Sequence, residues 1–259
     1  MRIYFLMRHL AYLRLYEASL LKLARRGHAI ELGLMPLSNK RFETQKIDEL
    51  VQAGQGKIHY TFLPPLPADF CTPFKDFSRS LIDYLRYFVP EYENAHKLRA
   101  RMAKRIPVFF KGMIQMLSLS PYLRAHLFPF LRKTLSGFED LFPVPSAVFK
   151  LWTDVKPDLV LFTPLLDSGM GMLDYAKGAK TLGIRTALCV ASWDNLTNKG
   201  LIQADVDKII VWNQFQKEEA IRFHHIPDEK IELTGAQVFD EWFDRRPKIS
   251  RKDFCEKVG

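Results

Sequence analysis

The sequence has few cysteines and no long apolar run. Its three cysteines, Cys71, Cys189 and Cys255, lie far apart and are odd in number, so they predict neither a disulfide framework nor a metal site. No uninterrupted apolar stretch reaches the roughly 18 residues that a membrane-spanning helix needs. The apolar start, 1–7, is too short for a secretory signal, and a basic pair follows it. These absences favour a reducing cytoplasm.

Internal repeats and low-complexity tracts are also lacking. The 259 residues are 47% hydrophobic, with frequent aromatic side chains, which is typical of a globular protein with a core and excludes a disordered chain. The length fits one large α/β domain or one and a half smaller ones.

Charge is unevenly placed along the chain, whose net charge is +9. Segment 70–135 holds nearly all of the excess, with twelve basic residues against four acidic ones. This implies an anionic partner: phospholipid headgroups, a lipid phosphate or nucleic acid. No recognised nucleic-acid-binding motif is present, so we do not expect nucleic acid. The twelve basic residues are Lys75, Arg79, Arg86, Lys97, Arg99, Arg101, Lys104, Arg105, Lys111, Arg124, Arg132 and Lys133.

The hydrophobic pattern predicts an alternation of strands and helices. Strands 2–7 and 29–34 flank a helix at 12–26 that ends at Gly27, which is the βαβ opening of a Rossmann-like sheet. A third strand is expected at 57–62. Later strands are expected at 159–163, 186–190, 208–211 and 231–234, and later helices at 144–155, 173–182 and 214–224.

Between these two halves, 74–138 is rich in aromatic and basic residues. It predicts mostly helix, broken at its four prolines, Pro90, Pro107, Pro121 and Pro129. The predicted fold class is therefore α/β, a Rossmann-like parallel sheet with helices on both faces and a helical insertion at about 70–138. We expect one domain at 1–245, followed at 246–259 by a linker and the start of a truncated second domain.

A polar loop at 192–200 follows the strand 186–190, at the edge where open α/β sheets bind ligands. Trp193 offers a face for stacking, Asp194 and Asn195 offer hydrogen bonds, and Lys199 offers a charge for a phosphate. The alternative is structural: Asp and Asn side chains often bond their own loop, and Trp193 would anchor it.

Four segments together resemble the N-terminal domain of glycosyltransferases with the GT-B fold. The likeness is to bacterial enzymes of surface-carbohydrate assembly and, more distantly, to nucleotide-sugar epimerases and glycerophosphotransferases. It spans most of 1–240 apart from the insertion. The segments lie within 7–28, which includes Met7-Arg8-His9, and at 192–200, 211–227 and 234–240, the last of which begins Thr234-Gly235-Ala236.

The resemblance implies two Rossmann-like domains across a cleft, the first holding the acceptor and the second the nucleotide-sugar donor. We assign no glycine-rich donor loop here, so we expect an acceptor-binding half with little activity alone, needing a donor domain or partner subunit. The expected partner is a sugar or lipid-linked acceptor. Beyond the donor as co-substrate, no cofactor and no metal are expected. His224-His225 makes no metal pair, because adjacent side chains diverge on a helix.

The resemblance also implies roles for single residues. His9, after the first strand, would be the catalytic base that removes the acceptor proton, since an imidazole titrates near about pH 6.5. The alternative is that His9 caps a loop or pairs with Glu17. Arg8 would bind a phosphate or an acidic sugar, or be an ordinary surface residue. The expected substrate-binding residues are Arg8, Tyr12, Ser192, Trp193, Asp194, Asn195, Lys199, Gly235 and Gln237.

Two further functions remain open from the sequence. One is a non-catalytic module that docks on an anionic membrane surface or on a partner subunit, through the insertion. Against it, the insertion would be a layer covering the sheet, with its basic residues solvated. The other is an epimerase or glycerophosphotransferase. The best membrane-facing patch is expected at Phe109, Phe110, Lys111, Met113, Ile114, Met116 and Leu117.

Overall fold

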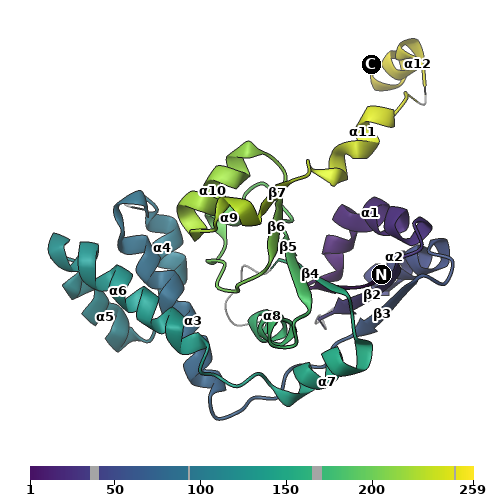
Figure 1. Ribbon diagram of the computed structural model, residues 1–259. Coiled ribbons are helices and arrows are strands. Elements are labelled where there is room, and N and C mark those ends of the chain that lie inside the picture. The colour runs from purple at the N-terminus through teal and green to yellow at the C-terminus, as the bar shows by residue number, and fades with distance from the viewer. Residues whose placement is uncertain (36–40, 93, 165–170, 248) are drawn as a thin grey trace.

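The computed structural model describes residues 1–35, 41–92, 94–164, 171–247 and 249–259. Within them, seven strands form one parallel sheet in the order β3-β2-β1-β4-β5-β6-β7 (Figure 1). The chain winds outward from β1 to β3, and then from β4 to β7, as in doubly wound Rossmann-like sheets. The strands are β1 Arg2–Met7, β2 Ala29–Leu34, β3 Ile58–Phe62, β4 Leu159–Thr163, β5 Arg185–Cys189, β6 Lys208–Val211 and β7 Ile231–Leu233.

Helices cover both faces of this sheet, which confirms the predicted α/β class. Adjacent residues of β1 point to opposite faces, so Tyr4 packs into one core and Phe5 into the other. Phe5 lies with α1 (Leu13–Arg25) and Tyr4 with α7 (Ser146–Val155). The remaining helices of the two layers are α2 Arg41–Ala53, α8 Met172–Thr181 and α10 Gln214–His224.

A helical lobe stands beside the sheet, where the insertion was predicted (Figure 1). It consists of α3 (Thr72–Leu85), α4 (His96–Ala103), α5 (Val108–Leu117) and α6 (Pro121–Glu139). The lobe is held by a core of its own rather than by the sheet's cores. The buried members of this core are Tyr84, Leu85, Tyr87, Phe88, Met102, Ile106, Ile114 and Phe128.

The predicted break at Pro129 is wrong, because α6 continues through it. A proline inside a helix removes one hydrogen bond and costs about 3 kcal/mol in a free helix. Here Phe128 is fully buried in the core of the lobe, while Pro129 itself is exposed. Packing of the buried face therefore holds the helix together across the lost bond.

Shorter elements lie at the loops and at the C-terminus. The four-residue helix α9 (Asn195–Asn198) falls inside the predicted ligand loop. Helices α11 (Asp240–Asp244) and α12 (Arg251–Val258) extend away from the sheet (Figure 1). Among the described helices, none combines the length and apolar composition that crossing a bilayer takes. The 3-10 turns are η1 Leu10–Tyr12, η2 Arg86–Phe88, η3 Pro90–Tyr92, η4 Asp228–Lys230 and η5 Gln237–Phe239.

Candidate functional site

Hydrogen bonds from the loop after β1 and from α1 join the carboxyl ends of the central strands. The backbone N–H of Arg8 donates to the carbonyl of Thr163, which joins the loop after β1 to the end of β4. The Tyr16 hydroxyl donates to the carbonyl of Cys189 at 3.1 Å and lies 3.2 Å from the Thr163 hydroxyl. Burial raises the pKa of Tyr16, so its hydroxyl keeps its proton. These bonds fix the edge on which the loops stand.

A cavity of about 650 Å³ opens at this edge, between α1 and the loops after β5, β6 and β7. We call it the His9 cavity. Its wall combines groups that form hydrogen bonds with aromatic and aliphatic side chains, a mixture suited to a ligand with both hydroxyls and apolar faces. The rings of His9 and Tyr12 are 6.1 Å apart. Other wall residues are Leu15, Ser192, Trp212 and Gln237.

Gln237 reaches the His9 cavity from η5. Its Nε2 donates to the carbonyl of Leu15 at 3.0 Å, which holds η5 against α1. The turn before η5 depends on Gly235, whose φ of +81° lies in the region that favours glycine. Within the described residues, no atom lies within 4 Å of a Cβ placed on Gly235. Gly235 therefore supplies a backbone conformation that other residues rarely adopt.

The Ser192 loop is held by its own side chains, as the structural alternative anticipated. Asp194 accepts hydrogen bonds from the Asn198 amide at 3.0 Å and from the Ser192 hydroxyl at 2.7 Å. Both bonds lower the pKa of Asp194, and the bond from Asn198 has the larger effect. Asn195 is buried, and its Oδ1 accepts from the backbone N–H of Ala191 at 3.2 Å. Asp194 and Asn195 thus give the loop its shape.

The far end of this loop faces the helical lobe. Arg101 donates to Asn198 Oδ1 at 3.0 Å, and Arg86 donates to the carbonyl of Lys199. Trp193 is 73% exposed, so it does not anchor the loop as the alternative supposed. Its indole stands in solvent, outside the wall of the His9 cavity.

Four of the ten predicted site residues therefore meet in one place. They come from loops that are far apart in the sequence, and the sheet alone brings them together. The four in the wall of the His9 cavity are His9, Tyr12, Ser192 and Gln237. Outside the wall lie Arg8, Trp193, Asp194, Asn195, Lys199 and Gly235.

Gln216 is a positioning residue that no sequence pattern marked. It is buried at the start of α10 and bridges two loops of the His9 cavity. Its Nε2 donates to the carbonyl of Ser192 at 3.1 Å, and its Oε1 accepts from the backbone N–H of Trp212 at 2.8 Å. One side-chain amide therefore sets the spacing between the loops after β5 and β6.

His224 joins the Ser192 loop to the segment that follows it. Its Nδ1 accepts from the backbone N–H of Ile202 at 3.0 Å, and its Nε2 donates to the carbonyl of Leu196 at 2.7 Å. Burial lowers the pKa of His224 to about 3, so the ring is neutral and can play both roles. Only its doubled histidine motif marked it in the sequence.

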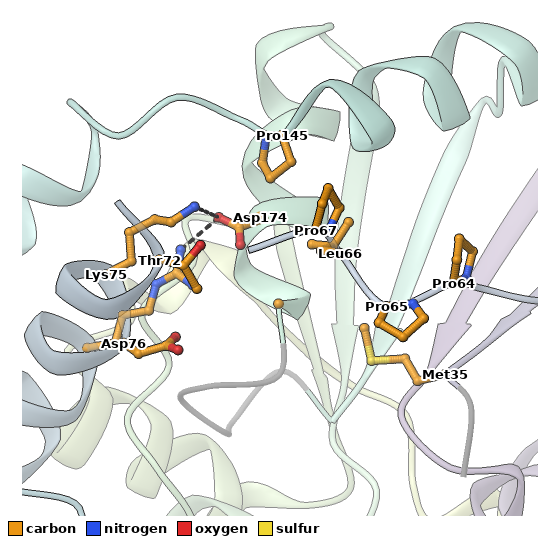
Figure 2. Close-up of a pocket in the computed structure, with 12 residues that line it drawn as sticks. Met35, Pro64, Pro65, Leu66, Pro67, Thr72, Lys75, Asp76, Pro145 and Asp174 are labelled. Atoms are coloured by element: carbon orange, nitrogen blue, oxygen red, sulfur yellow. Dashed lines mark hydrogen bonds and ion pairs between the residues drawn. The ribbon is translucent and has the colours of Figure 1, made fainter. Parts of the chain in front are cut away.

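A second, smaller cavity of about 310 Å³ lies near the carboxyl ends of β2 and β3, where Met35 and Pro64 line it. We call it the Lys75 cavity. Figure 2 shows Lys75 of α3 and Asp174 of α8 on one side, and the apolar Leu66 and Pro65 on the other. Lys75 is buried, and among the described residues its ammonium lies 3.5 Å from Asp69 and 4.0 Å from Asp174.

Arg79 crosses from the lobe to the sheet beside the Lys75 cavity. Its guanidinium donates to Glu139 at 2.6 Å and to Asp174 at 2.9 Å, and its side chain is almost wholly buried. Burial acts to lower the pKa of Arg79, but the bonds to Glu139 and Asp174 outweigh it and raise the pKa. The basic segment is therefore not all surface, because Lys75, Arg79 and Arg86 are interior.

Acidic, histidine and cysteine side chains do not gather in groups of three or more that could hold a metal, as far as the described residues extend.

The sequence matches no family model and no curated protein. Two solved structures are similar in shape, both at a TM-score of 0.39. CalG4, the calicheamicin glycosyltransferase, is 13% identical over 91% of this chain and 52% of its own. UGT89C1 of Arabidopsis thaliana, complexed with UDP, is 12% identical, and the match covers 99% of this chain and 54% of UGT89C1. This chain spans about half the length of either protein.

Proposed function

We propose that this chain is the acceptor-binding domain of a nucleotide-sugar-dependent glycosyltransferase that builds a surface glycan or glycolipid. The observation that carries the proposal is the meeting of His9, Tyr12, Ser192 and Gln237 at one cavity. The cavity lies at the carboxyl edge of a doubly wound sheet, where such folds bind ligands. The segments that resemble GT-B glycosyltransferases supply all four residues.

In this proposal His9 is the catalytic base. Its imidazole accepts the proton of an acceptor hydroxyl while the hydroxyl oxygen bonds to the anomeric carbon of the donor sugar. The bond from that carbon to the nucleoside diphosphate breaks, and the diphosphate leaves with the electron pair. Tyr12 and Trp212 offer ring faces to the acceptor sugar, and Gln237 and Ser192 offer hydrogen bonds.

The donor would be held by a second domain that packs against the C-terminal part of this one. The side chains of α11 and α12 support this, because several large apolar ones are bare. Trp242 is 64% and Phe243 80% exposed, and Phe254 and Val258 are also exposed. On this proposal 1–245 is the acceptor domain, 246–259 leads to the donor domain, and the chain alone transfers little or no sugar.

The test measures binding and transfer separately. Calorimetric titration of the chain with glycan and lipid-linked sugar acceptors should give saturable binding that Tyr12→Ala and Gln237→Ala weaken. With a donor domain present, His9→Ala should reduce the transfer rate by about 10²–10⁴-fold while binding persists. The matched control is His59→Ala, an exposed histidine on β3. Full transfer by His9→Ala, or acceptor binding lost only in Lys75 variants, would contradict the proposal.

A further inference from the structure

Helix α5 has one face inside the lobe and one face outside it. Ile114 is buried in the lobe core, with Phe110 and Leu117 packed against that core. The opposite face carries Val108, which is 77% exposed, and Met116, which is 64% exposed. Ile114 and Met116 both belong to the membrane-facing patch expected from the sequence, and the structure places them on opposite sides of the helix.

The bare side of α5 is continuous and apolar. Residues at spacings of one, three and four lie on the same side of a helix, so 108, 109, 112, 113 and 116 form one stripe. Its glycine, Gly112, has open space where a side chain would be. Two large apolar side chains that follow the helix, Leu119 and Tyr122, are also exposed. We call this set the outer apolar face; its members are Val108, Phe109, Met113, Met116, Leu119 and Tyr122.

Basic residues are frequent in the sequence around the outer apolar face, and acidic ones are missing from it. Segment 94–137 contains nine lysines and arginines and no aspartate or glutamate. Lys104 and Arg105 are exposed directly before α5, and Lys133 is exposed on α6. Exposed positive charge thus stands directly beside the start of the outer apolar face, at Lys104 and Arg105.

We propose that the outer apolar face docks on an anionic lipid bilayer, with Phe109 and Met116 entering the headgroup boundary. An apolar helix side bordered by lysine and arginine fits that interface, since the apolar side chains leave water while the charges meet lipid phosphates. A second copy of the chain fits poorly, because it would bring two like-charged surfaces together. The inference does not depend on the proposed transfer activity.

Docking would also orient the His9 cavity relative to the membrane. The lobe is bonded to the Ser192 loop through Arg101 and Arg86 and to α8 through Arg79, so these bonds join the lobe to the sheet. Figure 1 shows α5 at the far side of the lobe from the sheet. The cavity would therefore be held at a fixed distance from the lipid surface.

The test is co-sedimentation with phosphatidylcholine vesicles, with and without phosphatidylglycerol. Binding should require the anionic lipid and weaken as salt is added. Phe109→Ser should lower the partition coefficient about tenfold, because one large apolar side chain no longer leaves water. The control is Phe215→Ser on α10, since Phe215 is 76% and Phe109 75% exposed. Both substitutions are at the surface, and circular dichroism checks that the fold is kept.

A second pair of variants tests the charges. Lys104→Glu beside α5 should lower binding about tenfold, whereas Lys22→Glu on α1 should not. Binding that ignores the anionic lipid, or equal losses in Phe109→Ser and Phe215→Ser, would overturn the inference. So would a dimer in sedimentation velocity that Phe109→Ser dissociates, because a second copy would then occupy the face.

Discussion

The sheet and the helical lobe differ in where they place charged and apolar side chains. In the sheet, β1 buries Tyr4 and Phe5 in two cores, and neutral groups such as the His224 ring hold the loops. In the lobe, Arg79 is interior, while Phe109 stands in solvent. The lobe has an ordinary apolar core, but part of its charge lies inside and part of its apolar surface outside.

The difference shows which features each region needs for folding. Arg79 is bonded to carboxylates of α6 and α8, so its burial joins the lobe to the sheet. No residue of the outer apolar face is among the described members of the lobe core. Apolar surface that folding does not use is best explained by binding, so the two regions are expected to fail in different ways when changed.

The largest effect is expected from Arg79→Met. The substitution removes the guanidinium that bonds Glu139 at 2.6 Å and Asp174 at 2.9 Å, and the loss of one partner of a buried ion pair costs about 3–5 kcal/mol of the free energy of unfolding. Urea denaturation followed by circular dichroism measures it. Lys104→Met, an exposed control in the same lobe, should stay within about 0.5 kcal/mol of the parent chain. Equal values for the two would mean that Arg79 does not join lobe and sheet.

The two sides of α5 provide the next comparison. Ile114→Ala empties part of the lobe core and should cost about 2–5 kcal/mol. Met116→Ala, two residues away on the outer face, should change the free energy of unfolding by less than about 0.5 kcal/mol. Thermal and urea denaturation of both variants measure the contrast. A large loss in Met116→Ala would show that the outer face is packed and unavailable to lipid.

A pH effect is expected in the sheet. The pKa of His224 is about 3 in the folded chain against an ordinary 6.5, so between these values the unfolded chain binds the extra proton. The contribution of the neutral His224 ring to the free energy of unfolding is therefore fully present above pH 6.5. It is lost as the pH falls, by about 2 kcal/mol at pH 5. Urea denaturation at pH 7 and pH 5 tests this. His224→Gln should remove most of this dependence, whereas His59→Gln should keep it.

The smallest of these effects concerns the edge of the sheet. Tyr16→Phe removes the hydroxyl that bonds the end of β5 and should cost about 1–2 kcal/mol. Tyr122→Phe, on the exposed outer face, should cost nothing measurable. The free energies of unfolding of both variants decide the matter. A Tyr16→Phe chain as stable as the parent would show that the bonds of Tyr16 do not hold the edge.

Much of the sheet could be predicted because its signals are local. The strand at 208–211 and the helix at 214–224 fall where the pattern placed them, with Asn213 as the cap that starts the helix. The pattern did not predict helix α2, because its apolar stripe is short: among its described side chains, Ile47 and Leu50 are the buried ones. Continuation through Pro129 depends on packing that the sequence does not display.

The candidate site divides in the same way. His9 and Ser192 could be proposed because each follows a predicted strand at the ligand edge. Gln216 and Arg79 could not, because each bonds a partner that is distant in the sequence: Gln216 bonds Ser192 across 24 positions and Arg79 bonds Asp174 across 95. Their side-chain types suggested solvent, and only the fold shows that they are interior.

One titration tests the central claim about the His9 cavity most directly. The isotopically labelled chain would be mixed with glycan and lipid-linked sugar acceptors while the His9 ring and Trp212 indole signals are followed by NMR. We expect at least one acceptor to shift both signals saturably, and Gln237→Ala to weaken that binding. If every acceptor left both signals unmoved, or if binding shifted only residues around Lys75, the assignment of the site to the His9 cavity would be contradicted.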